Sequence, residues 1–455
     1  MNIKLSVSLC SLTLATALVV TTAPADAAPL PSKITSVRAV PGPGVGQVTI
    51  SWKQDGRNTS GYKIETGLTT FSKTSSSLPK TGRNAKVFAV GKGRRSVTLS
   101  AAQVSAAGAP ATSGNHLNFR LYAVNGSATR AYPYLQAVLP KPAPPKPSGT
   151  PIRLGTFNVR TAKATTDARP WLRRAPDVAR EIRDHNPGLV ALQELGPGRA
   201  DGKVGTTNGT TRHTTSLAIA LRSVGAGKYR LTRETSYVKP GTVFGTQGSR
   251  ILYDTSRYTL LSRCTDKTGK SSWSPTCGMI LPLLPGDKKS EQRAAAYARF
   301  QDKRTGKRIW FASVHLDARH SSNLATEKRY NSLRGSQMRT VYNKLRSVNT
   351  SGDQVIIAGD INSWQNNRAG NAPHDFLVAK GFTDTSAAQT RINTQYTTSN
   401  HFDTVLKPAG QGFGVRLDVI MVQGRYGAKR FENVMKRVDS TRPSDHNLVI
   451  SDVVI

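Results

Sequence analysis

Short runs of alternating apolar and polar residues occupy the chain from about residue 30 to residue 140. In GQVTISWK the apolar positions are Val48, Ile50 and Trp52, and turn residues separate this run from the next. The later run NHLNFRLYAVNG repeats the alternation with Leu117, Phe119, Leu121 and Ala123. Because side chains alternate between the two faces of a strand, short period-two runs at this spacing predict an all-β sandwich.

The pattern changes at a Pro-rich segment, LPKPAPPKPSGTP, which runs from Leu139 to Pro151. It contains few large apolar residues, and such a composition predicts a semi-extended linker, which we place at 141–150. The linker divides the chain into an N-terminal domain, 30–140, and a larger C-terminal domain, 151–455.

The C-terminal domain mixes strand-like apolar runs with a few helix-like segments. A helix is expected in WLRRAPDVAREIRDH, where Leu172, Val178 and Ile182 recur at helical spacing, and a second one at about 327–347. The strand-like runs include IRLGTFNV, GLVALQEL, RIWFASVHLD, QVIIAGDIN and NLVISDVVI. Many strands with few helices predict an α/β sandwich, with sheets packed on each other and helices outside.

The first 27 residues have the pattern of a secretory signal peptide. Lys4 is followed by an apolar stretch from Leu5 to Val20 and by the small-residue cleavage pattern Ala25-Asp26-Ala27. No later stretch approaches the roughly 20 apolar residues that a transmembrane helix needs. We therefore expect a secreted, monomeric protein without a transmembrane segment.

Two cysteines, Cys264 and Cys277, remain once the signal peptide with Cys10 is removed. In an exported protein an even pair is typical of a disulfide rather than of a metal site or a nucleophile. We expect these two residues to be bonded to each other.

The chain is strongly basic, with 64 Lys and Arg against 27 Asp and Glu and a net charge of +37. Residues 1–150 hold 17 basic and 3 acidic side chains, and the excess continues through residues 151–455. A field of this sign attracts polyanions such as nucleic acid, anionic lipid surfaces or acidic wall polymers. Charge alone names no substrate, and solubility or wall adhesion remain alternative explanations.

Residues suited to binding a metal or a phosphate follow one apolar run after another in the C-terminal domain. They end the runs LGTFN, LVALQE, WFASVH and VIIAGDIN, and they recur in RLDVI and PSDHN. Turn chemistry favours Gly, Pro, Asn and Asp but not Glu or His, so turns alone do not explain the set. Its members are Asn158, Glu194, His315, Asp360, Asn362, Asp418, Asp445 and His446.

In their order along the chain, FNVR, LQE, SVHLD, GDIN, RLDVI and SDHN resemble the endonuclease/exonuclease/phosphatase superfamily. The histidine of SVHLD favours the deoxyribonuclease I-like branch. The resemblance implies a four-layer α/β sandwich and metal-dependent cleavage of phosphate esters. In the N-terminal domain, VTISW and FRLYAVNG resemble the fibronectin type III family, which implies a sandwich of that type.

The resemblance also implies a metal site and a base. Glu194, Asn158 and Asp445 would hold Mg²⁺, which prefers oxygen ligands, with Mn²⁺ or Ca²⁺ as alternatives. His446 would be the general base, and the Asp418 carboxylate would fix its tautomer and stabilise the imidazolium.

The remaining residues of the implied site would act on the water and the phosphate. Asp360 and Asn362, two apart on a segment expected to be extended, should point to the same side, to orient the water and hold a phosphate oxygen. His315 would be a general acid or a phosphate donor, and Arg160 and Arg293 would bind phosphate. The family's carboxylate partner of the His315 position is replaced by Gln247 here, which puts the general-acid role in doubt.

Three functions compete at this stage. The first is a secreted Mg²⁺-dependent endonuclease that cleaves DNA with little sequence preference. The second is a phosphodiesterase or phosphatase on a phospholipid headgroup, sphingomyelinase-like or acting on inositol phosphates. It would need an exposed apolar hairpin, for which GMILPLLPG (Gly278 to Gly286) is the nearest candidate. The third is a non-catalytic adhesin whose basic N-terminal domain binds wall polymers or extracellular DNA.

Overall fold

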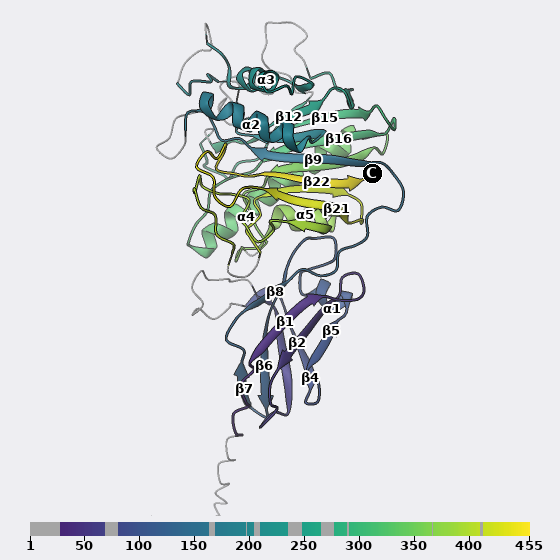
Figure 1. Cartoon of the computed structure of the whole chain (residues 1–455), viewed down its shortest axis with the longest axis vertical. Helices are drawn as coiled ribbons and strands as arrows, with labels where there is room; N and C mark the ends of the chain where they lie inside the picture. The colour runs from purple at the N-terminus through teal and green to yellow at the C-terminus, as the bar shows by residue number, and fades with distance from the viewer. Residues whose placement is uncertain are drawn as a thin grey trace, which may run out of the picture.

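The computed structural model of the chain is shown in Figure 1. The expected signal peptide and Gln247 lie outside the residues that the structure describes. The described residues are 28–68, 81–162, 169–196, 198–203, 210–234, 248–264, 277–288, 291–365, 367–409 and 413–455.

The N-terminal domain consists of two antiparallel sheets around one core. One sheet has the order β1-β2-β5, and the other has the order β4-β3-β6-β7, with β8 paired to β6. The alternating residues Val48, Ile50, Trp52, Leu117, Phe119, Leu121 and Ala123 are all buried in the core between them. The strands are β1 (Ser36–Pro41), β2 (Val48–Lys53), β3 (Gly61–Leu68), β4 (Thr81–Gly91), β5 (Ser96–Leu99), β6 (Leu117–Asn125), β7 (Ala128–Ala131) and β8 (Gln136–Val138).

One helix of this domain was not expected from the sequence pattern. It is α1 (Ala101–Ala106), which begins after Ser100. The Ser100 side chain accepts a hydrogen bond from the Gln103 backbone, and the Gln103 side chain accepts one from the Ser100 backbone. This capping box stabilises a helix too short to persist alone.

The C-terminal domain contains two seven-stranded sheets with a shared apolar core. The first has the order β11-β12-β10-β9-β22-β21-β19, and the second the order β13-β15-β16-β17-β20-β18, with β14 paired to β15. The first sheet comprises β9 (Pro151–Asn158), β10 (Leu189–Gln193), β11 (Tyr229–Leu231), β12 (Arg250–Asp254), β19 (Ala388–Ile392), β21 (Ala428–Val434) and β22 (Leu448–Val454). The second comprises β13 (Tyr258–Leu260), β14 (Gly278–Ile280), β15 (Ala294–Asp302), β16 (Arg308–His315), β17 (Gln354–Asp360), β18 (Phe382–Asp384) and β20 (Asp418–Gln423).

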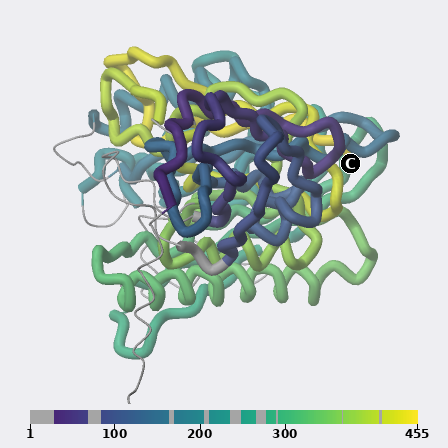
Figure 2. Tube along the Cα trace, turned by 90° about the horizontal axis from the view of Figure 1, so that it is seen from below, coloured from purple at the N-terminus to yellow at the C-terminus, as the bar shows by residue number. Residues whose placement is uncertain are grey.

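Helices pack on the face of each sheet that is turned away from the shared core. The first sheet is covered by α2 (Trp171–His185) and α3 (His213–Ser223), and the second by α4 (Leu324–Val348) and α5 (Ala372–Ala379). Figure 2 shows the long α4, in green, running along one side of the molecule. The expected helices correspond to α2 and α4, whereas α3 and α5 were not anticipated.

The buried face of α2 differs from the one expected. Val178 and Ile182 are buried as predicted, but Leu172 is 53% exposed. Trp171 and Ala175 complete the buried stripe instead. Consecutive helical residues are offset by about 100°, so burying Trp171 turns its neighbour Leu172 outward.

The two domains are in direct contact. The backbone oxygens of Thr112, Ser113 and Gly114 accept hydrogen bonds from Asp384 N–H at 2.9 Å, from His374 Nε2 at 2.9 Å and from Arg416 Nη2 at 3.0 Å. The linker contains neither helix nor strand, and its Ala143 oxygen accepts a hydrogen bond from the Gln389 side chain at 3.0 Å. The linker is therefore packed against the C-terminal domain.

The disulfide prediction is confirmed, because Cys264 and Cys277 are bonded and both are buried in the core between the two sheets. Of the helices in the described part of the chain, none is long and apolar enough to cross a membrane.

Candidate active site

Strand register places His315, Asp360 and Asp418 side by side in the second sheet. His315 on β16 is the parallel partner of Asp360 on β17, and Asp360 is the antiparallel partner of Asp418 on β20. Directly paired residues on neighbouring strands have side chains on the same face and within contact distance. Three residues far apart in sequence therefore lie in one row at the end of the sheet.

The first sheet contributes a second group to the same place. Asn158 ends β9 and pairs with Gln193, the last residue of the parallel strand β10, so that Glu194 follows directly. The Asn158 Nδ2 atom lies 3.2 Å from Glu194 Oε1 and 3.2 Å from Asp360 Oδ2. Asn158 thereby joins the ends of the two sheets, and two carboxylates converge on one amide.

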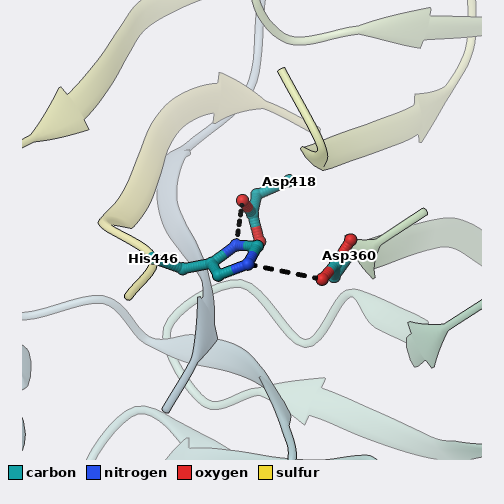
Figure 3. Close-up of side chains that lie close together, drawn as sticks. All are labelled: Asp360, Asp418 and His446. Atoms are coloured by element: carbon teal, nitrogen blue, oxygen red, sulfur yellow. Dashed lines mark hydrogen bonds and ion pairs between the residues drawn. The ribbon is translucent and has the colours of Figure 1, made fainter. Parts of the chain in front are cut away.

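His446 lies between two carboxylates (Figure 3). Its Nδ1 atom is 2.8 Å from Asp418 Oδ2, and its Nε2 atom is 3.8 Å from Asp360 Oδ2. All three residues are buried. If Asp418 accepts the Nδ1 proton, Nε2 is the nitrogen left to exchange a proton with a ligand, which is the geometry of a base with its orienting carboxylate.

Burial and charge change the protonation of this cluster. Burial raises the pKa of Asp360 to about 7, and the nearby Asp418 carboxylate acts in the same direction, while His446 opposes them. For His446, burial lowers the pKa, but the Asp418 and Asp360 carboxylates outweigh it and raise the pKa to about 10. The two carboxylates therefore favour an added positive charge at this position.

The donor atoms here suit a hard divalent cation. Asp360, Asp418 and His446 each offer one ligand atom, and these atoms lie within 4.8 Å of one another. Glu194 and Asn158 add a carboxylate and an amide beside Asp360. Since the His446–Asp418 hydrogen bond occupies Nδ1, the Glu194 and Asp360 carboxylates fit Mg²⁺ better than the imidazole does. Asn158 turns its Nδ2 donor toward these carboxylates, while its Oδ1 accepts from the Arg160 N–H at 3.1 Å, so it would have to turn its amide to become a ligand.

Two other expected site residues are paired with each other. Asp445, the third expected metal ligand, has its Oδ2 atom 3.0 Å from Arg160 Nη1, and Ser444 Oγ contacts its Oδ1 atom at 3.2 Å. Arg160, an expected phosphate ligand, is thus held by an acid in this structure. Both residues border the site, and the ion pair directs the Arg160 guanidinium toward Asp445.

His315 is buried beside Arg293, a contact that the sequence did not predict. The Arg293 Nη1 atom is 3.3 Å from His315 Nδ1, and Asp360 Oδ2 is 3.6 Å from His315 Nε2. Burial, together with the charges of Arg293 and His446, holds the pKa of His315 well below its ordinary value. A neutral imidazole with Arg293 donating to Nδ1 carries its proton on Nε2, which suits a hydrogen-bond donor to phosphate better than a cationic acid.

The expected geometry of Asp360 and Asn362 is wrong. Strand β17 ends at Asp360, and Asn362 has a left-handed backbone with φ of 46°, so the two do not share one extended segment. The Asn362 N–H donates to Asp360 Oδ1 at 2.9 Å, and its side-chain amide donates to the Leu316 oxygen at 3.1 Å. In this structure Asn362 fixes the Asp360 carboxylate and anchors the turn.

Left-handed backbones recur at the strand ends of the site. Arg160, Glu194 and Asn362 have φ of 59°, 61° and 46°, and each follows a strand by one or two residues. For residues with a Cβ atom this conformation is uncommon and costs on the order of 1–3 kcal/mol. The surrounding hydrogen bonds must hold these side chains in place.

Arg174 supports the loops around the site, and it was not predicted from the sequence. It lies on α2, is 1% exposed, and donates to the backbone oxygens of Val159 at 2.7 Å, Pro443 at 2.8 Å and Thr161 at 3.0 Å. It therefore clamps the loop after Asn158 to the segment that carries Asp445 and His446. The sequence did contain a sign of its burial, because Arg174 lies about one helical turn after Trp171, on the apolar face of the helix.

Comparisons with known proteins give distant matches only. No family model and no curated protein matches the chain. Similar solved structures include an endonuclease/exonuclease/phosphatase family protein of Bacteroides thetaiotaomicron, at 20% identity and a TM-score of 0.48, which covers 68% of this chain and 99% of that one. A mannosyl-6-phosphatase of the same organism matches at 20% identity and a TM-score of 0.47, covering 67% of this chain and 100% of that one.

A further similar structure is D. rerio TDP2 complexed with a single-strand DNA product. It matches at 17% identity and a TM-score of 0.42, and covers 67% of this chain and 98% of that one. Matches at these values assign neither a reaction nor a substrate, so the function has to be argued from the geometry of the site.

Proposed function

We propose that the chain is a secreted, metal-dependent phosphodiesterase of the endonuclease/exonuclease/phosphatase superfamily, with the deoxyribonuclease I-like four-layer sandwich at 151–455. The observation that carries the proposal is the His446–Asp418 pair beside Asp360, together with the Asn158–Glu194 contact at the same Asp360 oxygen. This arrangement places a base and an oxygen-rich cation site around one point. The fibronectin type III-like assignment of residues 30–140 and export through the signal peptide are parts of the same proposal.

In the proposed reaction His446 Nε2 takes a proton from the attacking water, which requires the neutral imidazole. The neighbouring Asp360 carboxylate contributes to the raised pKa of His446, and a cation beside that carboxylate would offset its charge and lower the pKa again. Asp418 holds the Nδ1 proton and stabilises the imidazolium that forms. Asp360 orients the water, while the His315 Nε2 proton and Arg293 hold phosphate oxygens. Glu194, and Asn158 with its amide turned to present Oδ1, would hold a cation, which would supply charge relief on the phosphate.

DNA is the substrate that we propose, hydrolysed with little sequence preference. The net charge of +37 favours a polyanion, and phosphate contacts do not read sequence. The phospholipid alternative needed an exposed apolar hairpin at Gly278 to Gly286. Met279 and Leu281 are buried there, Leu283 and Leu284 are half-buried, and Ile280, at 41%, is the one exposed large apolar side chain of the segment. That segment gives no support for membrane insertion.

A plasmid-nicking assay with the full-length protein tests the proposal. We expect nicking of supercoiled DNA with Mg²⁺, Mn²⁺ or Ca²⁺, its loss in EDTA, and a loss of about 10²-fold or more in His446→Ala. His185→Ala, a histidine at the end of α2, is the matched control and should keep its activity. If DNA and RNA both stay intact under every metal condition, the proposal is rejected. Hydrolysis of liposomes without nicking would instead support a phosphodiesterase or phosphatase that acts on phospholipid headgroups.

A further inference from the structure

The outer face of the sheet β1-β2-β5 in the N-terminal domain is formed almost entirely by hydroxyl and cationic side chains. Figure 1 shows the three strands side by side in this domain, and their alternate residues face the core. The outward residues form rows across the strands: Ser36 opposite Lys53, Arg38–Ser51–Ser96, and Val40–Thr49–Thr98. Most of them are exposed, Val40 alone is apolar, and none is acidic.

A third cation extends this face beyond the strands. The Trp52 N–H donates to the Arg95 oxygen at 3.0 Å, which continues the pairing of β2 with β5 by one residue. Arg95 turns toward the core, where its guanidinium carbon lies 5.3 Å from the centre of the buried Tyr62 ring. Since side chains alternate along the chain, the exposed Arg94 is directed outward, opposite Lys53.

These three cations have no acidic partner in the described part of the chain. Residues 28–150 contain 16 Lys and Arg but only two acids. Asp55 pairs with Arg57 at 2.9 Å, and Glu65 pairs with Lys63 at 3.0 Å, so both carboxylates are engaged elsewhere. Like charges at opposed positions destabilise a sheet, so the grouping of cations here does not serve the stability of the fold and points to an external anion.

The side chains of this face select the kind of anion. Lys, Arg, Ser and Thr are the groups that contact the phosphate oxygens of a nucleic-acid backbone. The face contains no aromatic residue to stack on unpaired bases. The large apolar side chains that are exposed in the described part of this domain lie on other segments, so the face is not suited to membrane insertion. They are Leu30, Val45, Val87 and Tyr134.

We propose that the outer face of β1-β2-β5 binds the sugar–phosphate backbone of double-stranded nucleic acid through Arg38, Lys53, Arg94 and the hydroxyls beside them. The choice of a duplex rests on the proposed function, because one long DNA molecule can then engage this face and the active site together. Such a second contact raises the effective concentration of substrate at the active site without changing the chemistry there. Because phosphate contacts do not read bases, the binding is independent of sequence.

Fluorescence anisotropy with the full-length protein and a labelled DNA duplex tests the proposal in EDTA, so that binding is measured without metal-dependent cleavage. The parent is compared with Arg38→Gln/Lys53→Gln/Arg94→Gln between about 50 and 200 mM salt. Each lost phosphate contact lowers the slope of log K against log salt by about 0.9, so we expect a slope that is smaller by about 2 to 3 and an affinity about tenfold weaker. An unchanged slope and affinity would overturn the proposal.

A second triple variant separates this face from the net charge of the domain. Lys86→Gln/Arg130→Gln/Lys141→Gln removes the same charge from β4, β7 and the linker, and we expect it to keep most of the affinity of the parent. Equal losses in the two triple variants would show that only net charge matters and would overturn the assignment to this face. Thermal unfolding midpoints show that both variants are folded, and that of the first should not fall, because it loses like charges that lie side by side.

Further outcomes distinguish this inference from the proposed function and from a membrane partner. A protein that never nicks plasmid DNA but binds a duplex through the three cations would reject the phosphodiesterase and support the binding face. Nicking by the parent, with full duplex affinity in the first triple variant, would do the reverse. Vesicles of phosphatidylserine and phosphatidylcholine are the alternative probe, and binding to vesicles but not to the duplex would assign the face to an anionic membrane surface and overturn the proposal.

Discussion

At the scale of single residues, the proposed chemistry depends on which nitrogen of His446 is free. The 2.8 Å contact with Asp418 engages Nδ1 and leaves Nε2 beside Asp360. Replacing the carboxylate changes this arrangement without removing the imidazole. A substitution of Asp418 therefore tests whether the reaction depends on the orientation and tautomer of the His446 ring, because the imidazole itself is still present.

We expect Asp418→Asn to lower the nicking rate by about 10²- to 10⁴-fold, because an amide that donates its N–H to Nδ1 favours the wrong tautomer. Asp452→Asn is the control: Asp452 on β22 forms an ion pair with Arg153 on β9 and lies outside the site. Nicking rates and thermal midpoints of the two variants are compared. An Asp418→Asn enzyme that is as active as the parent would show that the pair does not orient the base.

At the scale of elements, the site exists because strands from two sheets end at the same level. Parallel pairing of β16 with β17 brings His315 beside Asp360, and antiparallel pairing of β17 with β20 adds Asp418. Gly359 makes this close approach feasible. It has φ of 150°, and a Cβ atom built there would lie 2.0 Å from the backbone oxygen of Val314 on β16.

Gly359→Ala should therefore force β16 and β17 apart next to His315 and Asp360. We expect a loss of about 2 kcal/mol or more in stability, because the obstacle is backbone and cannot rotate away, together with a loss of nicking activity. Gly352→Ala is the matched control, since Gly352 also has a positive φ, of 66°, but nothing lies within 4 Å of its built Cβ. Equal changes in thermal midpoint for the two variants would show that the clash is not the cause.

At the scale of the whole molecule, the two domains are joined by a buried ionic cluster. His374 Nε2 contacts both the Ser113 oxygen at 2.9 Å and Asp384 Oδ2 at 3.1 Å, and Arg416 Nη2 contacts the same carboxylate oxygen at 3.1 Å. Burial lowers the pKa of His374, but Asp375 and Asp384 outweigh it and raise the pKa to about 9. The domain contact thus has a charged histidine at its centre.

A histidine with a raised pKa stabilises the fold below its ordinary pKa of 6.5, and this contribution is lost as the pH rises through about 9. We expect the free energy of unfolding to fall over that window by on the order of 3 kcal/mol, and His374→Gln to remove most of this dependence. His185→Gln serves as the control. Denaturation followed by tryptophan fluorescence at a series of pH values measures the free energy of unfolding of the parent and of both variants. An identical pH dependence in His374→Gln and the parent would contradict the raised pKa of His374.

The basic surface of the whole chain leads to a prediction on binding. With the His446→Ala protein, which should bind but not cleave, duplex DNA affinity should fall steeply with salt because bound phosphates release counterions. A protein with several phosphate contacts loses about 10²-fold or more between low and physiological salt. Fluorescence anisotropy with a labelled duplex measures the slope. Affinity that is insensitive to salt would exclude backbone-directed binding.

Sequence reasoning anticipated the chemistry-bearing residues better than their detailed contacts. Glu194, His315 and Asp360 could be found because each lies at or just after the end of an apolar run, whereas Asp418, which begins β20, was found from its place in the order of the motifs. The Arg160–Asp445 pair and the left-handed turn at Asn362 could not, because they depend on how separate loops pack. Short helices such as α3 and α5 were missed for a related reason: their apolar faces are defined by the sheet they cover.

The sequence by itself determined the strand and helix periodicities, the Pro-rich boundary between two domains, the paired cysteines and the order of polar residues at strand ends, because all of these are local patterns of side-chain chemistry. Only the tertiary structure decided which strands became neighbours and in what register. It alone placed His446 between Asp418 and Asp360 and joined the domains through His374. The physical reason is that burial, distance and charge between residues far apart in the chain are set by packing, which no local pattern specifies.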